Sequence, residues 1–301
     1  LVPRLLEEGY EVIVFDTQWF GVNLSHHEAL SVVKGDIRDV DSIPFEGVDV
    51  VIHLANIAND PGVELNQTVS WEVNVLATEL VASRARNAGV GHFIYASSGS
   101  VYGVSTEPLV TEDLSLVPIS AYNKTKMVAE RILLSYSNDF VVHIVRPATV
   151  CGMSPRMRLD VSVNLLTFQA LSRHGIRVFG GSQVRPNIHI LDMVRVYEHL
   201  LQNRSLPMGF YNAGFENLTI MDIARRISTS TGVEIEIVES NDPRSYRQDS
   251  SKLLQTGFHS LYSVDDAINQ MIEAFNEGLL KENETSWTVA RMKQLGLDQG
   301  A

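Results

Sequence analysis

Short apolar segments alternate with longer helical patterns over the first half of the chain. Strands are expected at residues 11–15, 31–34, 48–54, 92–96 and 140–145, and helices at residues 1–8, 69–88 and 121–136. The segment at 48–54 is almost wholly apolar, which is typical of a strand covered on both faces. This alternation favours βαβ units and therefore predicts an α/β fold with a doubly wound parallel sheet.

The alternation is less regular after about residue 150. Helical patterns occur near residues 161–173, 191–203, 218–231 and 263–280, with short strand candidates at 177–179, 209–212 and 233–238. A length of 301 residues fits one large domain or two closely joined ones, at roughly 150 residues per domain. We therefore expect a sheet domain over residues 1–150 and, over residues 151–301, a smaller α/β lobe that covers the open end of the sheet.

Charge and cysteine content narrow the possible classes of protein. The chain has 24 Lys and Arg against 36 Asp and Glu, and this net charge of −12 repels nucleic acid and anionic membranes. Its apolar runs fall well short of the ~18 residues of a membrane span. The single cysteine, Cys151, favours a reducing compartment, so we expect a cytoplasmic protein that binds neither nucleic acid nor membrane. His26 and His27 lie far from other candidate ligands, so no metal site is expected.

The chain begins with Leu1, inside a helical pattern that Gly9 closes. We interpret this start as that of a fragment without the first strand and the glycine-rich turn of such a sheet. That turn normally holds a dinucleotide pyrophosphate at the N-terminus of the following helix. The sequence as it stands is therefore expected to bind a dinucleotide poorly.

Asp16 follows the strand expected at 11–15. Ligands of doubly wound sheets bind beyond the carboxyl ends of the strands. A carboxylate at this place would accept hydrogen bonds from both ribose hydroxyls of an adenosine and would repel a 2′-phosphate, which favours NAD over NADP. The alternative is that Asp16 only caps a turn or a helix.

Serines follow the strand expected at 92–96, and Tyr122 and Lys126 lie four residues apart on the helix expected at 121–136. A spacing of four places two helical side chains on one face. Free tyrosine has a pKa near ~10, but a neighbouring ammonium group and the positive ring of an oxidised nicotinamide both favour the phenolate. Tyr122 would then take the proton of a substrate hydroxyl as its carbon loses hydride, while Ser98 donates a hydrogen bond to the same oxygen.

Each half of this arrangement has another explanation when it is taken alone. A Tyr-x-x-x-Lys spacing also arises by chance on surface helices or dimer-facing helices, and the serines would also fit a simple turn or a phosphate-binding loop. We favour the catalytic interpretation because Ser98 ends a strand about 24 residues before Tyr122, within an alternating α/β pattern.

In these motifs the sequence resembles the extended short-chain dehydrogenase/reductase superfamily, in its sugar-nucleotide epimerase/dehydratase branch. The resemblance covers about residues 1–280. It rests on Asp16, Gly35-Asp36-Ile37-Arg38-Asp39, His53-Leu54-Ala55, Asn74-Val75, the stretch 97–103, Tyr122 with Lys126, Arg146-Pro147 and Arg185-Pro186-Asn187-Ile188-His189. It implies a Rossmann-like fold, an NAD cofactor, a nucleotide-diphosphate sugar substrate, and a homodimer joined through the helices that carry Asn74 and Tyr122.

The resemblance also implies roles for individual residues. The catalytic residues would be Ser98, Tyr122 and Lys126. NAD would be bound by Asp16, Asp36, Ile37, Leu54, Ala55, Asn74, Tyr122, Lys126 and Pro147. The substrate would be bound by Ser98, Ser100, Thr149, Asn164, Arg185 and Arg244, of which Asn164 and the two arginines would hold the diphosphate. The alternative for each arginine is a surface ion pair.

Some positions depart from the family pattern and bear on the reaction. Family 4,6-dehydratases carry an Asp-Glu pair where this chain has Gly99-Ser100, and C3/C5 epimerases carry a cysteine near there, whereas Cys151 lies elsewhere. The resemblance therefore favours oxidation at C4 of the sugar followed by 4-epimerisation. The alternatives are a sugar-nucleotide 4-dehydrogenase, a dehydratase, a non-catalytic dinucleotide sensor, and an enzyme for a small substrate without a nucleotide.

Overall fold

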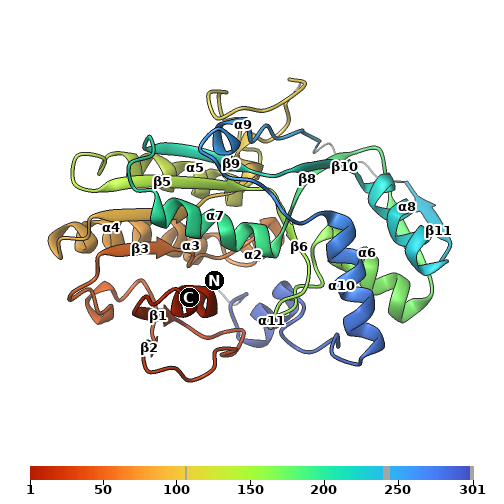
Figure 1. Ribbon diagram of the computed structural model, residues 1–301, viewed down its shortest axis with the longest axis horizontal. Coiled ribbons are helices and arrows are strands. Elements are labelled where there is room, and N and C mark those ends of the chain that lie inside the picture. Colours follow the sequence, from red (N-terminus) through yellow and green to blue (C-terminus); the bar gives the residue numbers. More distant parts are fainter. Residues whose placement is uncertain (106, 240–244, 299–301) are drawn as a thin grey trace.

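A four-stranded parallel sheet lies at the centre of the molecule (Figure 1). The computed structural model describes residues 1–105, 107–239 and 245–298. The strands follow the order β3 (Val50–His53), β4 (His92–Ala96), β5 (Val141–Pro147) and β9 (Gly209–Ala213). All neighbouring pairs are parallel, as expected of a doubly wound fold.

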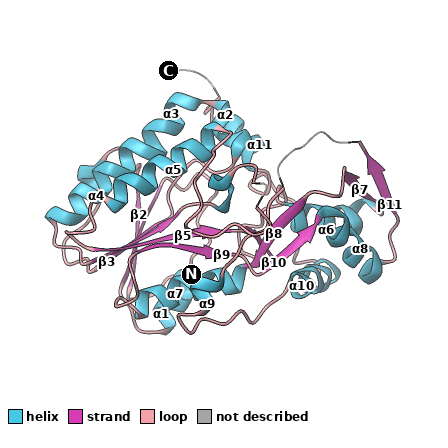
Figure 2. Ribbon diagram, turned by 90° about the horizontal axis from the view of Figure 1, so that it is seen from above, coloured by secondary structure: helices cyan, strands magenta, loops and turns pink. Residues whose placement is uncertain are grey.

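Helices cover both faces of this sheet (Figure 2). One face packs against α3 (Gln67–Trp71), α4 (Ala77–Asn87) and α5 (Ala121–Leu134), and the other against α1 (Val2–Glu7), α7 (Ile190–Gln202) and α9 (Ser251–Leu254). Side chains alternate along β4, so Phe93 and Tyr95 enter the first core while Ile94 enters the second. Cover on both faces explains why these strands are so apolar.

A second parallel pair, β1 (Val12–Asp16) and β2 (Leu30–Lys34), lies beside the main sheet. Within the described ranges no backbone ladder joins β1 to β3, so the two sheets are separate. The pair is also poorly covered, because Ile13 is 43% exposed and Val32 is 39% exposed.

The second half of the chain builds most of a smaller lobe. Its strands are β6 (Thr149–Cys151), β7 (Ile176–Phe179), β8 (Val184–His189), β10 (Glu216–Thr219) and β11 (Ile235–Val238), and its helices are α6 (Ser162–Arg173), α8 (Ile220–Thr231) and α10 (Val264–Asn276). β8 pairs with β6 in parallel and with β10 in antiparallel orientation, while β7 and β11 form a parallel pair. The short helix α11 (Thr288–Gln294) packs against α2 (Asp60–Leu65) of the first half.

The chain also returns to the main sheet after residue 150. Helix α7 covers one face of that sheet, and β9 extends it beside β5. Helices α9 and α11 of the second half also pack with the first. The expected division into residues 1–150 and 151–301 stays a prediction.

The expected fold class, an α/β fold with a doubly wound parallel sheet, is confirmed by this architecture. Helix starts carry the side chains that such ends require: Ser120 caps α5, Thr219 and Asp222 form a capping box on α8, and Ser263 begins another on α10.

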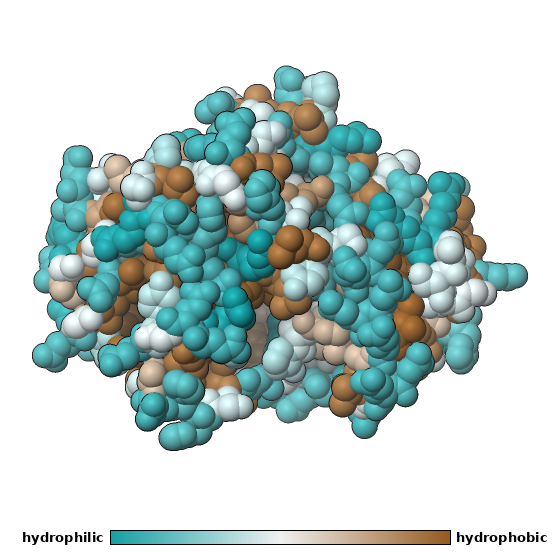
Figure 3. Space-filling view, in the orientation of Figure 1, coloured by the Kyte–Doolittle hydropathy of each residue, from teal (hydrophilic) through white to brown (hydrophobic). Residues whose placement is uncertain are grey.

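In the part of the chain that the structure describes, no helix is long and apolar enough to cross a membrane. On the face shown in Figure 3, apolar residues are scattered among hydrophilic ones.

Candidate active site

The three residues expected to be catalytic meet at the carboxyl end of β4. Tyr122 and Lys126 lie one turn apart near the start of α5, which Ser120 caps. Tyr122 hydrogen-bonds with Ser98. Lys126 Nζ donates a 2.7 Å hydrogen bond to the carbonyl of Ala96, two residues before Ser98. The tyrosine, the lysine and the serine turn therefore share one corner of the main sheet.

A chain of hydroxyl groups continues from Ser98. The Oγ atoms of Ser98 and Ser100 are 2.7 Å apart, and Ser100 donates a 2.7 Å hydrogen bond to Oδ1 of Asn123, a buried residue next to Tyr122. The turn that carries these serines, the 3₁₀ segment Gly99–Tyr102, ends at Gly103, where a Cβ would lie 2.0 Å from the Val117 carbonyl. The serine turn is thus fixed both by its own hydrogen bonds and by close backbone packing.

Burial opposes ionisation of both Tyr122 and Lys126. It raises the pKa of Tyr122 to about 12, although the hydrogen bond with Ser98 and the charge of Arg158 act in the other direction. It lowers the pKa of Lys126 to about 7, although the charge of Glu130 acts to raise it. The sequence predicts that Lys126 makes Tyr122 basic. In this structure the largest influence on the pKa of Tyr122 is burial, which acts in the opposite direction.

The residues expected at the adenosine lie at the ends of β1 and β2. Asp16 is exposed, and its Oδ1 accepts a hydrogen bond from the backbone N–H of Gln18 at 2.5 Å. Asp36 pairs with Arg38 at 2.8 Å; burial alone would raise the pKa of Asp36, but the hydrogen bonds and charge of Arg38 lower it. Ile37 packs into the core and is 8% exposed, so its expected contact with adenine stays a prediction.

Asn74 holds the loop that follows β3. It lies in a π-helical turn, Glu72–Leu76, between α3 and α4, and it is fully buried. Its amide bonds both the N–H and the C=O of Ile57, at 2.7 Å and 3.0 Å, and also donates to Thr125 Oγ1 on α5 at 3.1 Å. Single π-helical turns often occur at functional sites. Asn74 thereby ties the loop carrying the exposed Leu54 and the half-buried Ala55 to the helix that carries Tyr122.

The substrate residues expected from sequence take different positions. Pro147, expected beside the nicotinamide, is the last residue of β5, and Thr149 is the first residue of β6. Both therefore lie near the carboxyl end of β5. Asn164 is buried and spans its own loop, because its amide accepts from the N–H of Gly152 at 3.0 Å and donates to the Arg158 carbonyl at 2.9 Å. Arg185 lies on β8. Arg244 lies outside the described residues.

Several residues near the site are not apparent from sequence patterns. Arg158, in a loop, and Asp60, at the start of α2, both act electrostatically on Tyr122. Below the site, buried Glu130 pairs with Arg146 at 2.8 Å and accepts a 2.6 Å hydrogen bond from Ser97. The spacing of Glu130 four residues after Lys126 is the one sequence signal that could have indicated it.

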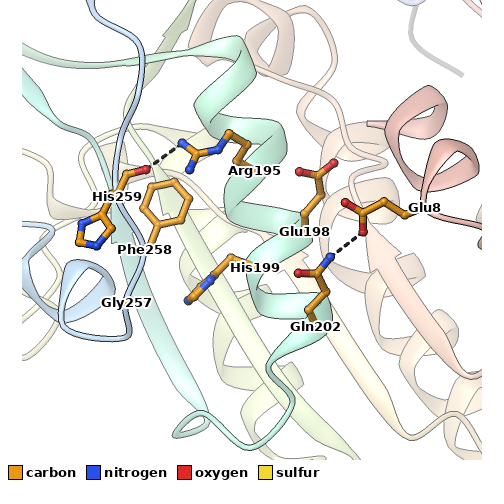
Figure 4. A pocket seen from close by; sticks show the side chains of 8 residues that line it. All are labelled: Glu8, Arg195, Glu198, His199, Gln202, Gly257, Phe258 and His259. Carbon is orange, nitrogen blue, oxygen red and sulfur yellow. Dashed lines mark hydrogen bonds between the residues drawn. The ribbon is translucent and has the colours of Figure 1, made fainter.

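A surface cavity of about 200 Å³ lies away from these residues, between α7 and the loop at 257–259 (Figure 4). Its polar groups bond to one another: Arg195 donates to the His259 carbonyl at 2.7 Å, and Gln202 donates to Glu8 at 2.5 Å. None of the site residues expected from sequence lines this cavity. Among the described residues no group of three or more His, Cys, Asp or Glu could hold a metal ion.

Comparison with known proteins places the chain in a family. The model of the NAD dependent epimerase/dehydratase family matches residues 1–214. An uncharacterized UDP-glucose epimerase of Bacillus subtilis is 30% identical over 219 residues, covering 70% of this chain and 67% of that protein. A UDP-glucose 4-epimerase of Lactobacillus helveticus is 26% identical over 283 residues, covering 83% of this chain and 84% of that protein.

A solved structure shows the same fold. A dTDP-glucose 4,6-dehydratase from Streptomyces venezuelae, with NAD bound, superposes with a TM-score of 0.82 at 24% identity, covering 95% of this chain and 94% of that one. The fold, the site at the carboxyl end of β4 and the matched family model agree with one another. The chain therefore belongs to the NAD-dependent epimerase/dehydratase family of enzymes.

Proposed function

We propose that this enzyme oxidises C4 of a nucleotide-diphosphate sugar and returns hydride to the opposite face, which is 4-epimerisation. The observation that supports this most directly is the grouping of Ser98, Tyr122 and Lys126 at the end of β4, with serine hydroxyls and no carboxylate in the turn. The relatives whose names specify UDP-glucose 4-epimerases support the same chemistry.

The residues present fit an NAD cofactor. Lys126 makes a single hydrogen bond among the described residues, to Ala96, so two N–H groups are left to donate to ribose hydroxyls. At the other end, the exposed carboxylate of Asp16 leaves Oδ2 to accept from an adenosine ribose. When bound, NAD supplies the hydride acceptor and a positive ring charge.

Proton transfer is then the task of Tyr122. Its Oη takes the proton of the C4 hydroxyl as the C4–H bond breaks, and gives that proton back when the carbonyl is reduced again. Ser98 donates a hydrogen bond to the same substrate oxygen and stabilises the charge that develops there. A nearby positive charge is needed because the pKa of Tyr122 is raised to about 12, chiefly by burial.

Crowding at Gly99 supports epimerisation over dehydration. A Cβ at this position would lie 3.1 Å from each of three atoms: Gln248 Nε2, the Pro147 carbonyl oxygen and Tyr246 Oη. A carboxylate-bearing side chain would require these neighbours to move. The neighbouring hydroxyl of Ser100 is already bonded to Asn123, so the turn offers no acid to protonate a leaving hydroxyl.

Further parts of the proposal concern the substrate, the assembly and the compartment. The diphosphate would be held by Asn164, Arg185 and Arg244. Arginine suits this task because its guanidinium group presents a planar fork of hydrogen-bond donors. Leu76 and Leu80, 60% and 40% exposed along the π-helical turn and α4, would pack against a second copy in a homodimer. The protein would act in the cytoplasm.

The test measures conversion of UDP-glucose and other nucleotide sugars by the purified protein with NAD, with absorbance at the reduced-nicotinamide band followed in parallel. Tyr122→Phe should lower the rate at least about a hundredfold, since a general base contributes 10²–10⁴. The matched control is Tyr10→Phe, a partly exposed tyrosine outside the site. A Tyr122→Phe protein with near wild-type conversion would exclude this mechanism, and one that only binds NAD would indicate a non-catalytic role.

A further inference from the structure

Lys126 has an unusual environment for a charged group. Its side chain is 1% exposed and it forms no ion pair in the described part of the chain. The carboxylate that follows it by one turn, Glu130, is bonded in a bidentate manner to Arg146, at 2.9 Å and 2.8 Å. A buried ammonium without a carboxylate partner loses much of its hydration and is stabilised only by what lies directly against it.

An aromatic ring provides that contact. Nζ of Lys126 lies over the ring of Tyr95, 4.8 Å from its centroid. Tyr95 is on β4, is 1% exposed, and stacks on the imidazole of His53 with centroids 5.6 Å apart and planes at 26°. His53 is itself fixed by a 3.0 Å hydrogen bond to Thr78 Oγ1. Stacking on His53 therefore holds the ring of Tyr95 with one face toward the ammonium group of Lys126.

We propose that the ring of Tyr95 is a positioning element for Lys126, holding the ammonium charged and in place at the carboxyl end of β4 through a cation–π contact. Such contacts stabilise a cation most when it is desolvated. This inference rests on the proposed function, in which Lys126 must be cationic to bind ribose and to favour the phenolate of Tyr122.

A ring suits this place better than a carboxylate would. A carboxylate would occupy N–H groups of Lys126 that a ribose needs, and its negative charge would raise the pKa of Tyr122, as Asp60 already does. The ring face attracts the ammonium without taking a hydrogen bond. The hydroxyl of Tyr95 is buried and has no hydrogen-bond partner among the described residues, so the ring is the part that acts.

The other groups that face Lys126 have opposing effects. Glu130 on α5 raises the pKa of Lys126, and burial lowers it to about 7. His53 on β3 stays neutral because burial, aided by the charge of Lys126, lowers the pKa of that imidazole to about 3. Tyr122, on the same face of α5, is protonated at neutral pH because burial raises its pKa to about 12. Near pH 7 a modest cation–π contribution therefore decides how much of Lys126 is charged.

The test measures the ionisation of Lys126 directly and needs neither cofactor nor substrate. The chain has six lysines, so lysine labelled with ¹³C at Cε gives six signals, and Lys126→Met assigns the one of interest. Position 95 is compared as tyrosine, as phenylalanine (Tyr95→Phe) and as incorporated pentafluorophenylalanine. The last keeps the shape of the ring but reverses the charge distribution of its face.

Tyr95→Phe should titrate at Lys126 as the wild type does, and pentafluorophenylalanine should move the midpoint about one pH unit lower. At pH 7, NAD affinity should likewise be unchanged in Tyr95→Phe and weaker in the protein with the fluorinated ring. An unchanged midpoint with the fluorinated ring, in a protein that unfolds at the normal temperature, would overturn the inference. Because this titration involves no turnover, it is decided independently of the Tyr122→Phe experiment that tests the proposed function.

Discussion

The main sheet and the β1–β2 pair differ in burial although both are parallel and lie side by side. The main sheet has helices on both faces, and β4 is buried over residues 92–95. The β1–β2 pair is separate, and its residues are either exposed or half-buried, with none fully buried. Tyr122, Lys126 and Ser98 are positioned by the main sheet, whereas Asp16 and Asp36 depend on the smaller one. The end of the site expected to be catalytic is thus well supported, and the end expected to bind adenosine has a weaker support.

Hydrogen exchange of backbone amides should show the largest effect of this difference. A two-stranded sheet is marginally stable by itself, whereas core strands open only with global unfolding. We expect amides of β1 and β2 to exchange on the order of a thousandfold faster than those of β4 and β5, measured by mass spectrometry or NMR. The pair β7–β11 is an internal control, since it also has two strands but α6 and α8 cover it. Equal protection in β1 and β4 would refute the comparison.

The next effect concerns two ion pairs. Arg146 and Glu130 are 1% and 0% exposed beneath the main sheet's active-site corner, whereas Arg38 and Asp36 are 39% and 31% exposed after β2. Removing one partner of a buried pair leaves an uncompensated charge, so Arg146→Met should lower the free energy of unfolding by about 3–5 kcal/mol. The matched variant Arg38→Met should cost less than about 1 kcal/mol. Similar losses in denaturant melts of both variants would show that burial is not what separates the two regions.

Some helices and strands around the site can be predicted from sequence, and others cannot. The strand at 92–96 and the helix at 121–134 are confirmed within two residues, because apolar runs and the cap at Ser120 are local signals. The strands β6, β8 and β10 were not expected, since they are short and rich in polar residues such as Asn187 and Glu216. Their pairing is decided by contacts distant in sequence, which a period-two pattern does not report.

The electrostatics of the site were the least predictable part. The spacing of Tyr122 and Lys126 indicates a shared face, but the pKa of each depends on burial and on loop residues such as Arg158. The π-helical turn that aims Asn74 at Ile57 also has no sequence signature. These features arise only when separate segments pack together.

Acid should weaken the main sheet in particular, because its strands contain the buried histidines His53, His92 and His143. Burial lowers the pKa of His53 to about 3 from an ordinary 6.5. Below about pH 6.5, His53 therefore binds a proton in the unfolded chain but not in the folded chain. Stability is lost as the pH falls from there toward 3. At pH 5 we expect a loss of about 2 kcal/mol from His53. His53→Gln should remove that part of the pH dependence of unfolding, whereas the same change at exposed His26 should not.

The smallest expected effect lies on the weaker sheet, at Asp16. Asp16→Asn keeps the side-chain oxygen that accepts from Gln18 but removes the charge, so the turn should persist. If the carboxylate binds the adenosine ribose, NAD affinity should fall about tenfold, as for the loss of a hydrogen bond to a charged group, and the preference over NADP should narrow. Asp39→Asn, at another exposed carboxylate nearby, is the control, with affinities measured by calorimetry. Unchanged NAD affinity in Asp16→Asn would show that Asp16 only stabilises its own turn. Recognition of the cofactor would then depend on residues of the main sheet.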